Sequence, residues 1–190
     1  MIKLILILLF IGLSCRGDVD GLEKLETDIV GLIKGFNGDV GVYVRHLFSN
    51  TALGVNENKI FPTASMIKVP ILVKIFDKIE AGALKMDSVV YFNKAAINYP
   101  WKGDDALSRF KDGEDITISK LLTHMITFSD NHASLWLQEV AGGGTAINAW
   151  LKENGFDYTR VNSRTEGREV HYQQYGWGQT TPKEMAELLV

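Results

Sequence analysis

Apolar and polar positions in the first third of the chain predict one helix followed by a hairpin. Apolar side chains recur at helical spacing over residues 22–36, which indicates an amphipathic helix. Valine then alternates with other residue types over residues 40–45, a Ser-Asn pair offers a turn, and a shorter apolar run covers residues 52–55. We therefore expect a β-hairpin over residues 40–55.

The middle of the chain shows a helical period interrupted by turn residues. Residues 65–81 form a wide apolar stripe, and Gly82 can end that helix. Pro70 falls within its first turns, where a missing backbone N–H costs least, so Ser65 would lie at the helix N-terminus. Three further helices are predicted over residues 118–128, 131–140 and 145–154.

The last residues of the sequence predict the start of another helix. Thr181 is placed to cap it, Pro182 suits its first turn, and Glu184 completes a capping box. The sequence stops inside this helix. Because a lone hairpin is a marginal sheet and no later strand follows to pair with it, we interpret the sequence as truncated at its C-terminus.

Composition and charge narrow the classes of function. With 190 residues and 46% hydrophobic content the chain can bury one ordinary core, so we expect a single domain over residues 16–190. The 20 basic and 23 acidic residues are mixed along the chain, which argues against nucleic acid as a partner. The four histidines show no pair at metal-ligand spacing and Cys15 is the only cysteine, so we expect no metal site. We expect no organic cofactor either.

Residues 1–15 have the pattern of a signal peptide. A lysine is followed by an apolar run over residues 4–13, which is too short to span a bilayer stably. Cys15 stands just after this run, where bacterial lipoproteins carry their lipidated cysteine, although Gly12 occupies the position that usually holds an aliphatic residue. We expect an exported protein, periplasmic or anchored to the outer membrane of a bacterium through Cys15. The alternative is an ordinary signal peptide that is cleaved nearby.

Ser65 and Lys68 form the first candidate for chemistry. On a helix, two residues at this spacing share one face, so the hydroxyl and the amine can approach hydrogen-bonding distance. A serine hydroxyl is a weak nucleophile until a neighbouring base takes its proton, and a lysine desolvated in an apolar helix can serve as that base. The alternative is a capping serine beside a lysine whose amine extends into solvent.

Ser129, Asp130 and Asn131 form the second candidate, at the junction of two predicted helices. Ser129 can relay a proton to a leaving nitrogen, and Asn131 can hold both Lys68 and a substrate amide by hydrogen bonds. All three residue types also favour caps and turns for local reasons, so the alternative is a helix cap.

These two motifs in their context resemble the class A β-lactamase family. Residues 61–70 contain Ser65-Met66-Ile67-Lys68 and residues 125–131 end in Ser-Asp-Asn, the combination typical of that family. The resemblance extends from about residue 40 to the last residue. It implies an α/β (α+β) fold of the β-lactamase/transpeptidase-like kind, with a helical region centred on the Ser65 helix and an antiparallel sheet flanked by helices. The C-terminal strands of that sheet would be missing, and the site would lie between the two parts.

A third motif resembles the start of the Ω-shaped loop of the family. Residues 164–166 read Arg-Thr-Glu, and the resemblance gives Glu166 the task of activating the water that hydrolyses the acyl-enzyme. Val170 stands where the family carries an asparagine that helps to hold this water, and a valine cannot form a hydrogen bond. The alternative for Glu166 is a solvated carboxylate that pairs with a nearby arginine. The candidates to replace the asparagine are Glu169, His171 and Tyr172. The arginines that could pair with Glu166 are Arg164 and Arg168.

The resemblance implies a serine β-lactamase that hydrolyses the β-lactam amide through an acyl-enzyme on Ser65. Its catalytic residues would be Ser65, Lys68, Ser129 and Glu166, with Asn131 binding substrate. The partner would be a small β-lactam, and we expect a monomer. One alternative is a cell-wall D-alanyl-D-alanine peptidase or another acyl-serine hydrolase, which does not need Glu166. Another is a non-catalytic penicillin-binding protein or an inert fragment, because the Lys-Thr-Gly strand of the family is absent from this sequence.

Overall fold

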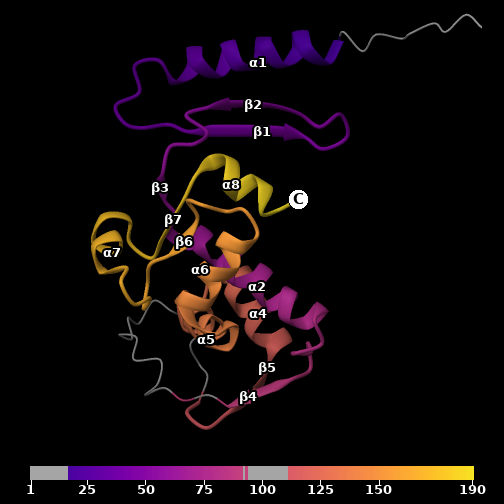
Figure 1. The fold of residues 1–190 in the computed structure, drawn as a ribbon, viewed down its shortest axis with the longest axis vertical. Helices are drawn as coiled ribbons and strands as arrows, with labels where there is room; N and C mark the ends of the chain where they lie inside the picture. The colour runs from indigo at the N-terminus through magenta and orange to yellow at the C-terminus, as the bar shows by residue number, and fades with distance from the viewer. Residues whose placement is uncertain (1–16, 92, 94–110) are drawn as a thin grey trace, which may run out of the picture.

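The first helix and the hairpin form a layer at one end of the molecule. The computed structural model describes residues 17–91, 93 and 111–190. Helix α1 (Gly17–Ile33) lies along strand β2 (Thr51–Val55), which pairs antiparallel with β1 (Val42–His46) (Figure 1). The predicted helix and hairpin are therefore confirmed, although the helix begins earlier than its apolar pattern. Cys15 and the predicted signal peptide lie outside the described residues.

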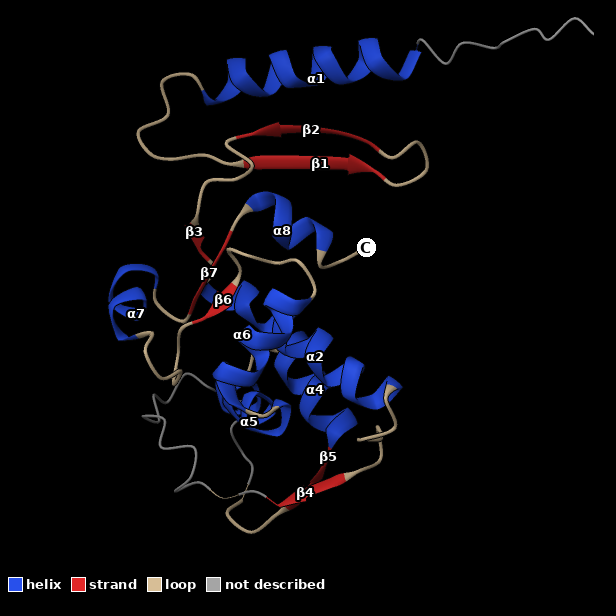
Figure 2. Cartoon of the chain, viewed as in Figure 1, coloured by secondary structure: helices blue, strands red, loops and turns tan. Residues whose placement is uncertain are grey.

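Four helices pack together in the other half of the molecule (Figure 2). They are α2 (Lys68–Glu80), α4 (Ile118–Thr127), α5 (Asn131–Ala141) and α6 (Gly143–Glu153). Their apolar faces share one core, and fully burying an aliphatic side chain contributes roughly 1.5–3 kcal/mol. Core side chains with no more than 1% exposure include Ile71, Ile75, Leu121, Met125, Leu135, Leu137, Ile147 and Leu151. The helical periods in the sequence thus predicted these helices to within a few residues.

The structure also contains short strands that the sequence did not predict. Strands β3 (Phe61–Pro62), β7 (Gly178–Thr180) and β6 (Arg160–Val161) form a small antiparallel sheet in that order. Strands β4 (Val89–Tyr91) and β5 (Asp115–Thr117) pair at the far end of the helices. Runs of two or three residues are too short to show a period of two. The pairing of β3 with β7 brings two segments that are distant in sequence together just before Ser65.

The last helix, α8 (Pro182–Glu187), packs against β1 on the side opposite α1. Thr181 caps it as predicted, since its hydroxyl accepts the Glu184 N–H at 3.1 Å. The second half of the predicted capping box is wrong. The buried Glu184 carboxylate instead accepts the backbone N–H groups of residues 157, 158 and 159, and the Thr159 hydroxyl. Several donors from one loop outcompete the single N–H of a capping box, and they tie α8 to the segment before β6.

Within the described residues the hairpin remains a two-stranded sheet, as expected from the sequence. A groove of about 670 Å³ opens between β1 and α8, and it is mostly apolar. Phe61, Met66 and Met185 are among the side chains that line it. Across residues 17–91, 93 and 111–190, no helix is both long and apolar enough to cross a membrane.

Candidate active site

Ser65 lies exposed on a short turn between β3 and α2. The sequence predicted one helix from Ser65 onward, whereas the structure has a 3-10 turn (Ala64–Ile67) that leads into α2. Ala64 has φ of 46°, a left-handed conformation that is costly for a residue with a Cβ. The Thr63 N–H donates to the Gly178 carbonyl at 3.0 Å and so fixes the entry to this turn. The turn leaves the Ser65 hydroxyl at the surface and buries the Lys68 side chain next to it.

The Lys68 amine joins the two sequence motifs. Its side chain is only 3% exposed, so the alternative in which the amine extends into solvent is wrong. Nζ donates to Ser129 Oγ at 2.8 Å, to Asn131 Oδ1 at 3.0 Å and to Ser65 Oγ at 3.5 Å, and it also contacts the Ser129 carbonyl. Ser129 Oγ in turn donates to Ser65 Oγ at 3.0 Å. Two hydroxyls and an amine are therefore in mutual contact, an arrangement in which a proton can pass from one group to the next.

The Ser-Asp-Asn motif is both a helix cap and part of this cluster. Asp130 caps α5, because its Oδ1 accepts the Ala133 N–H at 3.0 Å. Ser129 has φ of 54°, a conformation that non-glycine residues seldom adopt. This bend turns the Ser129 side chain toward Lys68, and Asn131 reaches Lys68 from the first residue of α5. The capping alternative thus holds for Asp130 and not for its two neighbours.

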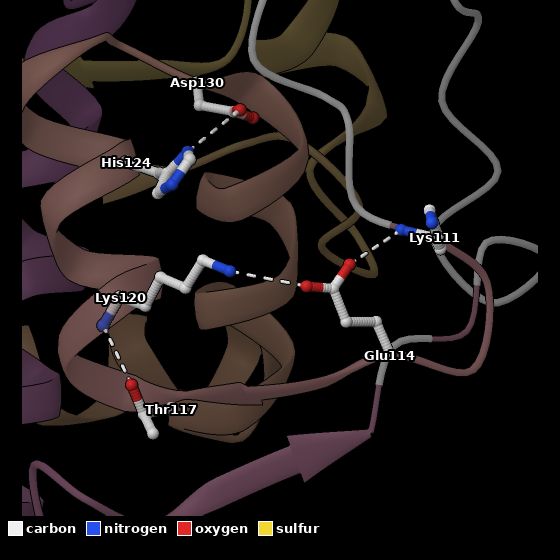
Figure 3. A network of polar contacts seen from close by, with 6 residues as sticks. All are labelled: Lys111, Glu114, Thr117, Lys120, His124 and Asp130. Carbon is white, nitrogen blue, oxygen red and sulfur yellow. Dashed lines mark hydrogen bonds and ion pairs between the residues drawn. The ribbon is translucent and has the colours of Figure 1, made fainter.

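Helix α4 contacts the Ser-Asp-Asn motif through His124 and Asp130 (Figure 3). Nδ1 of His124 lies 4.0 Å from Oδ2 of the buried Asp130, and the Asp130 N–H donates to the His124 carbonyl at 3.3 Å. At the start of the same helix, the Lys120 amine contacts Glu114 at 3.3 Å. Glu114 precedes the helix and also accepts the Lys111 N–H at 3.0 Å. The hydrogen bond from the Lys111 N–H and, to a smaller extent, that from the Lys120 amine hold the pKa of Glu114 below its ordinary value. These contacts fix both ends of the helix that leads to Ser129.

Glu166 is the second residue of a tight turn over residues 165–168. The Arg168 N–H donates to the Thr165 carbonyl at 3.1 Å, and Gly167 supplies the positive φ, 73°, that the third residue of such a turn needs. The Glu166 carboxylate is exposed and forms none of the hydrogen bonds within the Ser65 cluster. The Arg168 guanidinium does not pair with it either, because it turns toward Asn162 and Gln179.

Helix α7 (Glu169–Tyr175), which the sequence did not predict, follows this turn. Val170 is 73% exposed on it, which agrees with its lack of any hydrogen-bonding role. Glu169 accepts the Gly167 N–H at 3.2 Å, and the His171 carbonyl lies 3.5 Å from the Asn162 amide. Tyr172 is 45% exposed. The contacts of Glu169 and His171 shape the turn, and the assignment of a replacement for the family asparagine stays a prediction.

In the described part of the chain, no group of three or more histidine, cysteine, aspartate and glutamate side chains could hold a metal ion. The groove beside β1 borders the candidate site through Met66, but Ser65 does not line it.

Comparisons with known proteins agree with the motifs. The sequence model of the beta-lactamase enzyme family matches residues 24–190. A beta-lactamase from Bacteroides uniformis is 27% identical over 169 residues, which are 88% of this chain and 56% of that protein. The chain therefore spans a little over half the length of this relative.

Solved structures share the fold. A beta-lactamase from Chitinophaga pinensis superposes with a TM-score of 0.74 at 21% identity, over 87% of this chain and 61% of that chain. A PBP-A mutant, solved as an acyl-enzyme complex with penicillin G, superposes with a TM-score of 0.73 at 26% identity, over 88% and 60% of the two chains. The mixed helix-and-sheet fold expected from the sequence is confirmed.

Proposed function

The chain belongs to the beta-lactamase enzyme family, and on this premise we propose that it is a serine β-lactamase acting through an acyl-enzyme on Ser65. The observation that carries the proposal is the contact of the buried Lys68 amine with both Ser65 and Ser129. Because the chain spans 56% of the length of its relative, the activity is proposed for the longest natural form of the protein.

In the acylation step the Ser65 hydroxyl attacks the lactam carbonyl. Its proton passes to Lys68, whose amine lies 3.5 Å away, or through a water to Glu166. Backbone N–H groups beside the exposed serine stabilise the negative charge that develops on the carbonyl oxygen. The bond between carbonyl carbon and lactam nitrogen breaks, and an acyl-enzyme forms on Ser65.

The lactam nitrogen needs a proton as that bond breaks. Ser129 Oγ lies 3.0 Å from Ser65 Oγ and 2.8 Å from the Lys68 amine, so it can give its proton to the nitrogen and take another from Lys68. Asn131 holds the lysine in place at 3.0 Å and offers its amide to the substrate.

In the deacylation step Glu166 takes a proton from a water that attacks the acyl carbonyl, the bond from that carbonyl to Ser65 Oγ breaks, and the proton passes to Ser65 Oγ. The position of Glu166 in the Arg-Thr-Glu motif supports this role. The exposed Val170 cannot help to hold that water.

The same observations favour a second candidate, a cell-wall D-alanyl-D-alanine peptidase. Such an enzyme needs the contacts of Ser65, Lys68 and Ser129 but no carboxylate to activate a water. The exposed Val170, which cannot help to hold a hydrolytic water, supports this candidate.

Turnover of two substrates distinguishes the candidates. The longest natural form is given a penicillin or a peptide ending in D-alanyl-D-alanine, and product is followed over many turnovers. A β-lactamase releases many equivalents of opened penicillin and little D-alanine. Release of D-alanine together with a single equivalent of bound penicillin would replace the first proposal by the second.

We also propose that the protein is exported and acts as a monomer. The apolar run over residues 4–13 and Cys15 support export, by a lipoprotein or an ordinary signal. The mass of the mature protein tests this point, because a chain that begins with a lipidated Cys15 supports anchoring and a chain that retains residues 1–14 contradicts export.

A further inference from the structure

The guanidinium of Arg168 binds two buried amide side chains at once. Nε and Nη2 donate to Asn162 Oδ1 at 3.0 and 2.8 Å, and Nη2 also donates to Gln179 Oε1 at 2.7 Å. Asn162 is 2% exposed and Gln179 is 5% exposed. Burial lowers the pKa of Arg168 from its ordinary value, and the nearby charge of Arg160 lowers it further. A partly buried cation is thus held by neutral oxygens, with bonds strengthened by its charge.

Arg168 is also the last residue of the turn that carries Glu166. The hydrogen bond from the Arg168 N–H to the Thr165 carbonyl closes this turn, with Glu166 as its second residue. Because the backbone of Arg168 belongs to the turn and its side chain is anchored, the anchor limits where the Glu166 carboxylate can lie.

The far end of this anchor leads to the nucleophile. Gln179 lies in β7 and pairs with Pro62 in β3, three residues before Ser65. The Arg168 side chain therefore connects the Glu166 turn to the strand that positions Ser65. The connection runs through one side chain of β7, that of Gln179.

The other side of the turn is packed against α6. Thr165 is 7% exposed, and a Cβ atom at Gly144 would lie 1.8 Å from Thr165 Oγ1. The Gln138 amide also donates to the Ser163 carbonyl at 2.8 Å. The turn is thus fixed on both sides, with Arg168 on the side that faces the strand before Ser65.

We propose that Arg168 is a positioning residue for deacylation, acting through Asn162 and Gln179 to hold the Glu166 turn at a fixed place relative to Ser65. This inference rests on the proposed function, in which Glu166 activates the hydrolytic water. Only the planar fork of a guanidinium can bond both amides in this geometry, and a lysine amine at the same position would reach one of them. Arg168 is not assigned any contact with substrate.

The test compares acylation and deacylation in Arg168→Met and Arg168→Lys, in the longest natural form of the protein. Rates of formation and loss of the penicillin adduct are measured separately by quenched-flow mass spectrometry. Displacement of a catalytic group by about 1 Å can cost on the order of 100-fold in rate, so we expect deacylation to slow by about that factor in Arg168→Met. If Lys68 takes the Ser65 proton, the rate of acylation should change by less than about threefold, since the Ser65 cluster does not include Arg168.

Arg160→Met is the matched control. Arg160 is another partly buried arginine of the same region, and its guanidinium donates to the carbonyls of Phe156 and Thr159 rather than to the Glu166 turn. Both variants lose a buried guanidinium, so both should lower the melting temperature. Only Arg168→Met should lengthen the lifetime of the adduct and speed hydrogen exchange at the amides of residues 165–168.

Two results would overturn the inference. An adduct lifetime in Arg168→Met equal to that of the wild type, or one lengthened equally in Arg160→Met, removes the positioning role and leaves the proposed function intact. A wild-type protein that forms no adduct on Ser65 refutes the proposed function itself, and the role of Arg168 with it. Arg168→Lys, which keeps the charge, shows whether the fork or the charge matters if Arg168→Met does not fold.

Discussion

The Lys68→Met variant is expected to acylate between about 100 and 10,000 times more slowly than the wild type, the range typical of a lost general base. Methionine fills much of the same buried space but can neither accept the Ser65 proton nor donate to Ser129 and Asn131. The measurement is the rate at which a penicillin adduct forms in a single turnover, followed by quenched-flow mass spectrometry.

Lys78→Met controls for the general loss of a lysine from α2. Lys78 is partly buried and, like Lys68, donates to a carbonyl, that of Val140 at 2.7 Å, but it lies outside the Ser65 cluster. It should acylate at the wild-type rate within about threefold. Thermal melts establish that both variants are folded. A folded Lys68→Met that acylates as fast as Lys78→Met would show that Lys68 is not the base.

The Glu166→Gln variant is expected to form the penicillin adduct and keep it, with deacylation slowed by about 100- to 10,000-fold. A glutamine has nearly the shape of the glutamate but cannot take a proton from water. Since Glu166 forms no hydrogen bond within the Ser65 cluster, the variant should leave the Ser65–Lys68–Ser129 contacts unchanged. Intact-protein mass spectrometry at short and long times reads the result.

Glu169→Gln is the control for Glu166→Gln, three residues along the same segment. Its carboxylate is exposed as well and accepts one N–H, that of Gly167 at 3.2 Å. It should lose its adduct at nearly the wild-type rate. If Glu166→Gln and Glu169→Gln release the adduct equally fast, Glu166 does not activate the water, and the peptidase candidate gains support.

The sequence predicted best where a period or a motif is long. The apolar stripes of α2, α4, α5 and α6 run over ten residues or more, and each of these helices is found close to its predicted range. The two motifs containing Ser65, Lys68, Ser129 and Asn131 proved to be neighbours in space, as the resemblance implied.

The sequence predicted least where long-range contacts decide. Strands β3, β6 and β7 hold two or three residues each, and their pairing depends on which segments meet rather than on any local pattern. The partners of Glu184 come from residues 157–159. The partners of Arg168 are Asn162 and Gln179. No spacing in the chain signals these contacts, because each is set by the fold that brings the partners together.

The Ser65 cluster and the Glu166 turn therefore differ in how closely they follow the family. All four polar groups of the cluster are in contact before any substrate binds, which suits formation of an acyl-enzyme. After the Glu166 turn, Val170 stands where the family carries the asparagine that holds the water, and the Arg168 side chain at the end of the turn bonds Asn162 and Gln179. The lifetime of the adduct is thus expected to depend on the Glu166 turn and not on the Ser65 cluster.

If Ser65 is the nucleophile, penicillin must become attached to this serine. The wild type and Ser65→Ala are exposed briefly to a penicillin, quenched, digested, and analysed for the peptide that carries the added mass. We predict an adduct on the peptide containing Ser65 in the wild type and none in Ser65→Ala. An adduct of equal amount in Ser65→Ala, or one on another residue of the wild type, would contradict it.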